Sequence, residues 1–101
     1  MTRRLLYAPE AEAQLVHLYR YIAGEASPAI AQGFTDAIVD HCESLRHFPN
    51  RGTPRDDLRP GLRTISFRRR VVIAYAVSAD AVTIVGIFYG GRDYEAILED
   101  A

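Results

Sequence analysis

The stretch LRPGLRTISFRRRVVIAYAV, residues 58–77, decides the fold. Its two runs, Leu62–Phe67 and Val71–Val77, are rich in the β-branched and aromatic residues that strands favour. Arg68, Arg69 and Arg70 separate these runs by the short polar connection that a hairpin requires. A third run of the same kind, residues 82–89, follows the polar residues 78–81. Together the three runs predict an antiparallel meander.

Upstream of this stretch the pattern changes to helical spacing. Residues 3–8 are a short strand candidate, Pro9 suits the first turn of a helix, and Gly24 marks its expected end. Ser27 followed by Pro28 is typical of an N-cap that opens a second helix. So short a connection predicts an antiparallel helical hairpin. The apolar positions on its inner faces are Ala11, Leu15, Leu18, Tyr19 and Ile22 in the first helix, and Ile30, Phe34, Ile38, Cys42 and Leu45 in the second.

Two segments remain between and after these elements. Residues 48–61 contain three prolines and two glycines, which predicts an irregular crossing loop. Residues 92–100 could add a short C-terminal helix. The predicted order is therefore β-α-α-β-β-β with a final helix, an α+β fold with the helical hairpin packed on a small antiparallel-type sheet. The spacing leaves open which edge the N-terminal strand takes.

Composition sets the broad class. A chain of 101 residues with 49% hydrophobic content suits one domain spanning 1–101. The longest mostly apolar stretch, 71–89, is interrupted by polar residues and is too short for a membrane span, and the N-terminus lacks a secretory pattern, so we expect a cytoplasmic protein. The one cysteine, Cys42, falls on an apolar helical stripe and predicts a buried, inert thiol. No metal site and no cofactor are expected.

The charge distribution raises a question about function. All twelve cations are arginine, which excludes a lysine general base. Eight of them lie between Arg46 and Arg70 against only two aspartates, so this window carries +6 in a chain of net charge −1. A surface that neutralises nucleic-acid phosphates is one use of such charge. The pI of about 6.3 and the lack of a recognition helix or aromatic stacking platform argue against direct sequence-specific nucleic-acid binding.

Several short motifs, in this order and spacing, resemble the ParE branch of the RelE/ParE toxin superfamily. The resemblance covers nearly the whole chain and rests on these residues: Ala8-Pro9, Tyr21-Ile22-Ala23, Ser27-Pro28, Cys42-Glu43-Ser44-Leu45, Phe48-Pro49, Arg55-Asp56-Asp57-Leu58-Arg59-Pro60-Gly61-Leu62-Arg63 and Gly90-Gly91-Arg92-Asp93. It implies a toxin of a type II toxin–antitoxin system that forms a hetero-oligomer with a ParD-like ribbon-helix-helix antitoxin. The ParE branch is associated with non-catalytic inhibition of DNA gyrase, and the RelE branch with ribosome-dependent mRNA cleavage.

The residues favour the gyrase branch. Metal-independent RNA cleavage needs a base, an acid and fixed positive charge at the phosphate. The histidines, His17, His41 and His47, all fall in or at the end of the predicted helices, away from the strands. Tyr75 and Tyr89 remain as proton donors, although tyrosines in apolar strands are commonly packing residues. We therefore expect no catalytic residues, with a RelE-like ribonuclease as the alternative and an inactive toxin that still binds its antitoxin as a third possibility.

The basic window is interpreted as a receptor for an acidic antitoxin tail. Such tails are disordered and fold on binding, with apolar residues in a groove and carboxylates against cations. Arg55, Arg59 and Arg63 have an equal alternative as structural residues that hold the loop. At the C-terminus, Gly90 and the glycine after it present two polar residues, of which Asp93 has an N-cap as its alternative role. The predicted antitoxin- or target-binding residues are Arg59, Arg63, Arg68, Arg69, Arg70, Tyr89 and Arg92.

Overall fold

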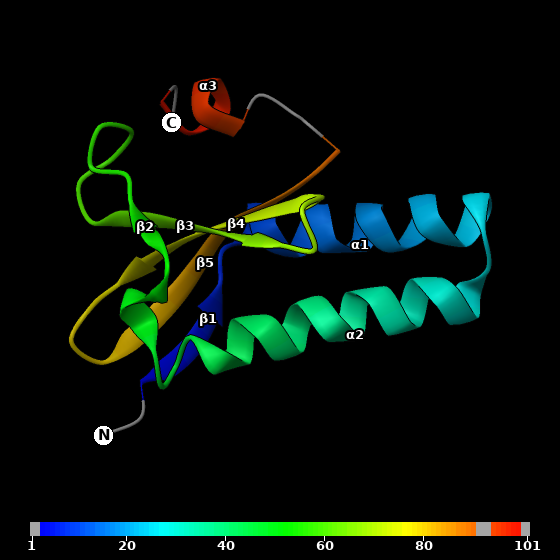
Figure 1. The fold of residues 1–101 in the computed structure, drawn as a ribbon, viewed down its shortest axis with the longest axis horizontal. Helices are drawn as coiled ribbons and strands as arrows, with labels where there is room; N and C mark the ends of the chain where they lie inside the picture. Colours follow the sequence, from blue (N-terminus) through cyan, green and yellow to red (C-terminus); the bar gives the residue numbers. More distant parts are fainter. Residues whose placement is uncertain (1–2, 91–93, 100–101) are drawn as a thin grey trace.

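A computed structural model describes residues 3–90 and 94–99 of the chain (Figure 1). A helical hairpin lies on one face of a five-stranded sheet, and a short C-terminal helix lies on the other. This arrangement confirms the predicted α+β class. The elements are β1 (Arg4–Tyr7), α1 (Pro9–Glu25), α2 (Pro28–Ser44), a 3-10 helix (Pro49–Arg51), β2 (Thr53–Pro54), β3 (Leu62–Phe67), β4 (Val71–Val77), β5 (Ala81–Tyr89) and α3 (Tyr94–Glu99).

The sheet is of the predicted antiparallel type except at the N-terminal strand, whose pairing is parallel and makes the sheet mixed. Its strand order is β1-β5-β4-β3-β2, with β1 parallel to β5 and the other pairs antiparallel. Two hairpin reversals separate β3 from β5, so these strands share a direction. The long loop before β3 allows that direction to match β1. The spacing did not decide which edge the N-terminal strand takes, and in the structure it takes the edge beside the last strand, β5.

The helical hairpin covers the sheet with most of the predicted apolar stripes. Ser27 Oγ accepts the backbone N–H of Ile30 at 3.1 Å, which confirms the predicted N-cap of α2. Two details of the prediction are wrong. Ile30 is 59% exposed, because the connection between the helices extends beyond the sheet and leaves the start of α2 uncovered (Figure 1). Helix α1 also continues through Gly24 to Glu25.

The core lies between the hairpin and the sheet. Its fully buried members come from both layers and include Ile38, Leu45, Ile73, Tyr75 and Ile84. A second, smaller apolar cluster forms on the opposite face, where Leu98 of α3 packs with residues of the sheet and the crossing loop: Leu58, Leu62, Ala74 and Phe88. The predicted C-terminal helix is therefore present over the residues that the structure describes.

The crossing loop 48–61 is more regular than predicted. It holds the 3-10 helix and β2, which pairs with β3 through Thr53 opposite Thr64 and Pro54 opposite Arg63. Proline is tolerated there because β2 is an edge strand. Sequence patterns miss a two-residue strand because it has no periodicity of its own and depends on β3.

Candidate functional site

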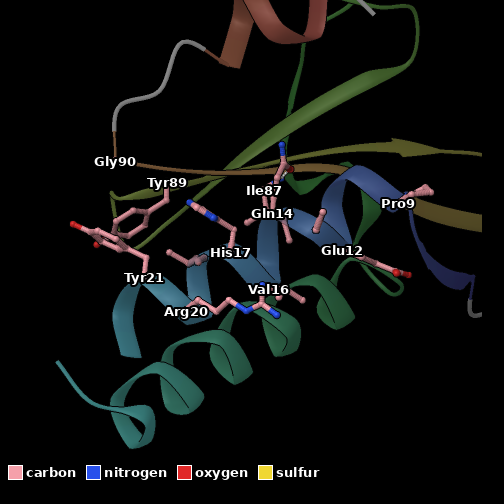
Figure 2. A pocket seen from close by; sticks show the side chains of 12 residues that line it. Pro9, Glu12, Gln14, Val16, His17, Arg20, Tyr21, Ile87, Tyr89 and Gly90 are labelled. Carbon is pink, nitrogen blue, oxygen red and sulfur yellow. Dashed lines mark hydrogen bonds between the residues drawn. The ribbon is translucent and has the colours of Figure 1, made fainter. Parts of the chain in front are cut away.

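A groove of about 1010 Å³ runs between the outer side of α1 and the C-terminal half of β5 (Figure 2). β1 pairs with β5 only as far as Ile84, and beyond that point α1 lies beside β5. Gln14 Oε1 accepts the backbone N–H of Ile87 at 2.7 Å, so a side chain replaces the missing strand. The lining is mostly apolar, with four polar or charged members. It consists of Pro9, Glu12, Ala13, Gln14, Val16, His17, Leu18, Arg20, Tyr21, Ile87, Tyr89 and Gly90.

Aromatic rings close the groove at the end of β5. The Tyr89 ring lies 6.1 Å from the Tyr21 ring and 6.1 Å from the Phe34 ring, measured between centroids. Phe34 in turn contacts Phe67 edge-on at 5.9 Å. Figure 2 shows Tyr21 and Tyr89 side by side near Gly90. The predicted site residue Tyr89 is therefore a half-buried packing residue whose ring also forms a wall of the groove.

The turn between β3 and β4 lies at this same end. The Arg68 guanidinium sits 5.7 Å from the Phe34 centroid and 5.0 Å from the Phe67 centroid, within the range of cation–π contacts. The backbone N–H of Gly90 donates to the carbonyl of Arg70 at 3.0 Å, which ties the turn to the end of β5. The predicted residues Arg68, Arg69 and Arg70 are all exposed. Tertiary structure thus brings them close to Tyr89.

Arg59 and Arg63 lie at the opposite end of β3 and serve the fold. Arg59 Nε donates to the carbonyl of Leu98 at 2.9 Å and so holds α3. A nitrogen of Arg63 donates to the carbonyl of Gly52 at 2.7 Å and so holds the crossing loop. The five residue steps of β3 separate Arg63 from Arg68 by roughly 17 Å. The predicted arginine strip is therefore two separate groups.

Arg55 has a structural role as well. It forms two hydrogen bonds to the Asp57 carboxylate, at 3.0 and 2.9 Å, and also pairs with Glu95 of α3. These bonds hold the pKa of Asp57 below its ordinary value. Arg55 thus links the crossing loop to the C-terminal helix.

The arginines of residues 3–90 divide into two classes by their partners. Seven of them have an internal partner: Arg4 forms an ion pair with Asp80, and the others donate to a carbonyl, hydroxyl or carboxylate, namely Arg3, Arg46, Arg51, Arg55, Arg59 and Arg63. Within this part of the chain, the side chains of four form neither a hydrogen bond nor an ion pair: Arg20, Arg68, Arg69 and Arg70. Three of those four are the consecutive residues of the β3–β4 turn. Arg92 of the predicted site lies outside the described residues.

Tyr75, a proton donor considered for RNA cleavage, is held inside the protein. Its side chain is fully buried, its hydroxyl donates to the carbonyl of Pro49 at 2.8 Å, and it accepts the backbone N–H of Gly52 at 2.8 Å. Burial is the main cause that raises the pKa of Tyr75 above its ordinary value. This hydroxyl anchors the crossing loop and has no path to a substrate.

The histidines and the cysteine occupy separate places. His17 on α1 lines the groove, the His41 ring on α2 contacts the Phe67 ring in a tilted arrangement with centroids 5.2 Å apart, and His47 follows α2. Cys42 is fully buried, as expected, and burial raises the pKa of its thiol to about 11. In residues 3–90 and 94–99 no three acidic, histidine or cysteine side chains gather where they could hold a metal ion. None of the helices described there is long and apolar enough to cross a membrane.

Sequence reasoning did not find the α1 side of this site. Gln14, His17 and Tyr21 lie beside the predicted apolar stripe, and Tyr21 is 51% exposed. The available sign was the spacing of His17 and Tyr21 by four residues, which places them on one helical face. That spacing alone does not show that β5 lies next to this face.

The fold and its comparisons define the class of protein. A chain of a solved structure described as the chromosomal ParDE TA system from P. aeruginosa has the same fold, with a TM-score of 0.76 and 23% sequence identity over 88% of this chain and 97% of that one. A comparison with curated proteins gave no match. The family model for the ParE toxin of the type II toxin–antitoxin system parDE matches residues 5–94. The chain therefore belongs to the ParE toxin family.

Proposed function

We propose that this ParE-type toxin inhibits DNA gyrase by binding without catalysis and that a ParD-like antitoxin neutralises it. The observation that carries the proposal is the match of residues 5–94 to the ParE toxin family. Both partners act in the cytoplasm, so the proposal places the toxin there. The organisation of its side chains supports binding more than chemistry.

The groove and the arginine turn together suit an acidic, amphipathic antitoxin tail. Val16, Ile87 and Tyr89 offer an apolar wall for aliphatic side chains, and the exposed arginines beside it offer forks for carboxylates. In this proposal the tail contacts Tyr89 and the turn directly, with Arg92 close in sequence. Arg59 and Arg63 support the surface indirectly, because their guanidinium groups already bind backbone carbonyls.

The contacts of the aromatic residues support a non-catalytic mechanism. The Tyr75 hydroxyl is hydrogen-bonded to two backbone groups of the crossing loop, and the Tyr89 ring packs against two other rings. His41 and His47 do not line the groove. His17 does line it, but no hydrogen bond joins its side chain to Tyr89 in residues 3–90. General acid–base catalysis requires such groups within hydrogen-bond reach of one reacting phosphate.

The test compares two targets with the same purified protein. We expect the toxin to inhibit supercoiling by gyrase and to increase cleaved DNA, and an equimolar ParD-like antitoxin to abolish both effects. In a parallel reaction with translating ribosomes we expect no new mRNA ends. Codon-specific cuts that disappear in Tyr89→Phe or Arg92→Ala would contradict the proposal and establish the ribonuclease alternative. A toxin that binds antitoxin but affects neither target would be the inactive form.

A further inference from the structure

The β3–β4 turn has a backbone conformation that is unfavourable for its residues. Arg68 and Arg69 adopt φ angles of 51° and 61°, in the left-handed region that glycine and asparagine occupy most easily. The N–H of Arg70 closes the turn on the carbonyl of Phe67 at 3.2 Å. Type I′ hairpin turns require this conformation and usually contain Asn-Gly or Gly-Gly. Two charged residues thus occupy positions whose backbone conformation favours glycine or asparagine.

Within residues 3–90 and 94–99 no acidic group pairs with that charge, and only Arg68 uses it internally, over the Phe34 and Phe67 rings. The side chains of the other arginines in the basic window bind carbonyls, carboxylates or, for Arg51, a hydroxyl, whereas those of the turn form no ion pair in residues 3–90 and 94–99. Arg68 is held over the Phe34 and Phe67 rings, which limits its freedom and fixes its guanidinium at the surface. The turn therefore presents three adjacent cations, one of them pre-oriented.

Shape separates two kinds of anionic partner. An acidic peptide with apolar residues suits the concave groove beside α1, where its side chains are covered. The turn is the exposed tip of a hairpin, and adjacent arginines at a protruding tip suit the regularly spaced phosphates of a nucleic-acid strand.

We propose that the turn Arg68-Arg69-Arg70 binds the phosphodiester backbone of duplex DNA independently of base sequence. This activity goes beyond gyrase binding and requires neither gyrase nor antitoxin. Three phosphates neutralised by three arginines predict a slope of about −2.7 for the logarithm of affinity against the logarithm of salt concentration. Affinity should then fall about 40-fold between 50 and 200 mM salt.

The experiment measures fluorescence anisotropy of a labelled duplex of random sequence with the full-length toxin. The double variant Arg69→Ser/Arg70→Ser keeps the Arg68 ring contacts and should reduce the salt effect to about 4-fold. The matched control, Arg3→Ser/Arg4→Ser, removes the same charge from β1, whose Arg4 lies opposite the start of β5. The control should retain the wild-type salt dependence. Circular dichroism confirms that both variants are folded.

Three results would overturn the proposal: no binding to the duplex at 50 mM salt, equal weakening in the control, or binding of polyglutamate but not of DNA. The last result would limit the turn to the acidic antitoxin tail, as the proposed function already has it. Because the assay contains no gyrase, its failure leaves the proposed gyrase inhibition intact. If the wild-type toxin binds the duplex as expected but does not inhibit gyrase, only the proposed function is contradicted.

Discussion

Replacing Tyr75 by phenylalanine removes one oxygen that joins β4 to the crossing loop. The hydroxyl binds the Gly52 N–H and the Pro49 carbonyl, each at 2.8 Å, from a fully buried position. Gly52 is buried too, so its N–H cannot turn to water in the variant. An unsatisfied buried donor costs about 1–3 kcal/mol, and the half-buried Pro49 carbonyl adds to this loss. We expect Tyr75→Phe to lower the free energy of unfolding by about 2–3 kcal/mol.

Urea unfolding followed by circular dichroism measures this difference from the shift in midpoint at constant slope. Tyr7→Phe is the matched control, because the buried Tyr7 hydroxyl has no backbone partner and only the weakly hydrogen-bonding Cys42 thiol beside it. That variant should be unchanged or slightly more stable. If Tyr75→Phe unfolds at the wild-type urea concentration, or if both variants lose the same stability, the loop is not anchored by this hydroxyl and the reasoning is refuted.

Three further predictions concern stability. Phe34→Ala should lower the free energy of unfolding, measured in urea, by roughly 2–3 kcal/mol. The loss is smaller than for a fully buried phenylalanine because the ring is half-buried between Phe67, Tyr89 and Arg68. An unchanged stability would show that this aromatic contact is unimportant. Burial, with Arg51 as a smaller cause, lowers the pKa of His41 below its ordinary value of 6.5. As the pH drops below about 6.5 the unfolded state therefore binds a proton that the folded state does not, and the free energy of unfolding should fall. His41→Gln should remove this part of the pH dependence, and a pH profile identical to that of the wild type would contradict the prediction. Arg69→Gly should raise the free energy of unfolding by about 0.5 kcal/mol, and the melting temperature with it, because glycine adopts a positive φ without strain. Arg70→Gly should lower the melting temperature, and the reverse order of the two variants would refute the strained turn.

Local patterns were sufficient for most of the secondary structure. The strand runs at Leu62–Phe67 and Val71–Val77 have the predicted bounds, and Ser27 caps α2 as expected. These features depend on side-chain periodicity and on capping chemistry, which act over a few residues. The errors fall where distant parts decide: β2 exists because β3 is beside it, and Ile30 is exposed because the sheet does not reach it.

The candidate site was predicted only in part for the same reason. The sequence drew attention to Arg68, Arg69, Arg70 and Tyr89, but grouped these arginines with Arg63 because they are neighbours in the chain. An extended strand separates such neighbours by its length, and a backbone carbonyl can occupy a guanidinium without leaving a pattern in the sequence.

By itself the sequence determined the α+β class, the helical hairpin, the β3–β4–β5 meander and the resemblance to ParE toxins, because each is encoded in short-range order. Only the tertiary structure decided that β1 runs parallel to β5 and stops at Ile84, that α1 borders the groove left beyond it, and which arginines remain without an internal partner. Those properties depend on contacts between residues far apart in the chain. For Arg3 and Ser78, 75 residues apart, no local pattern indicates which hydrogen bonds the folded chain completes.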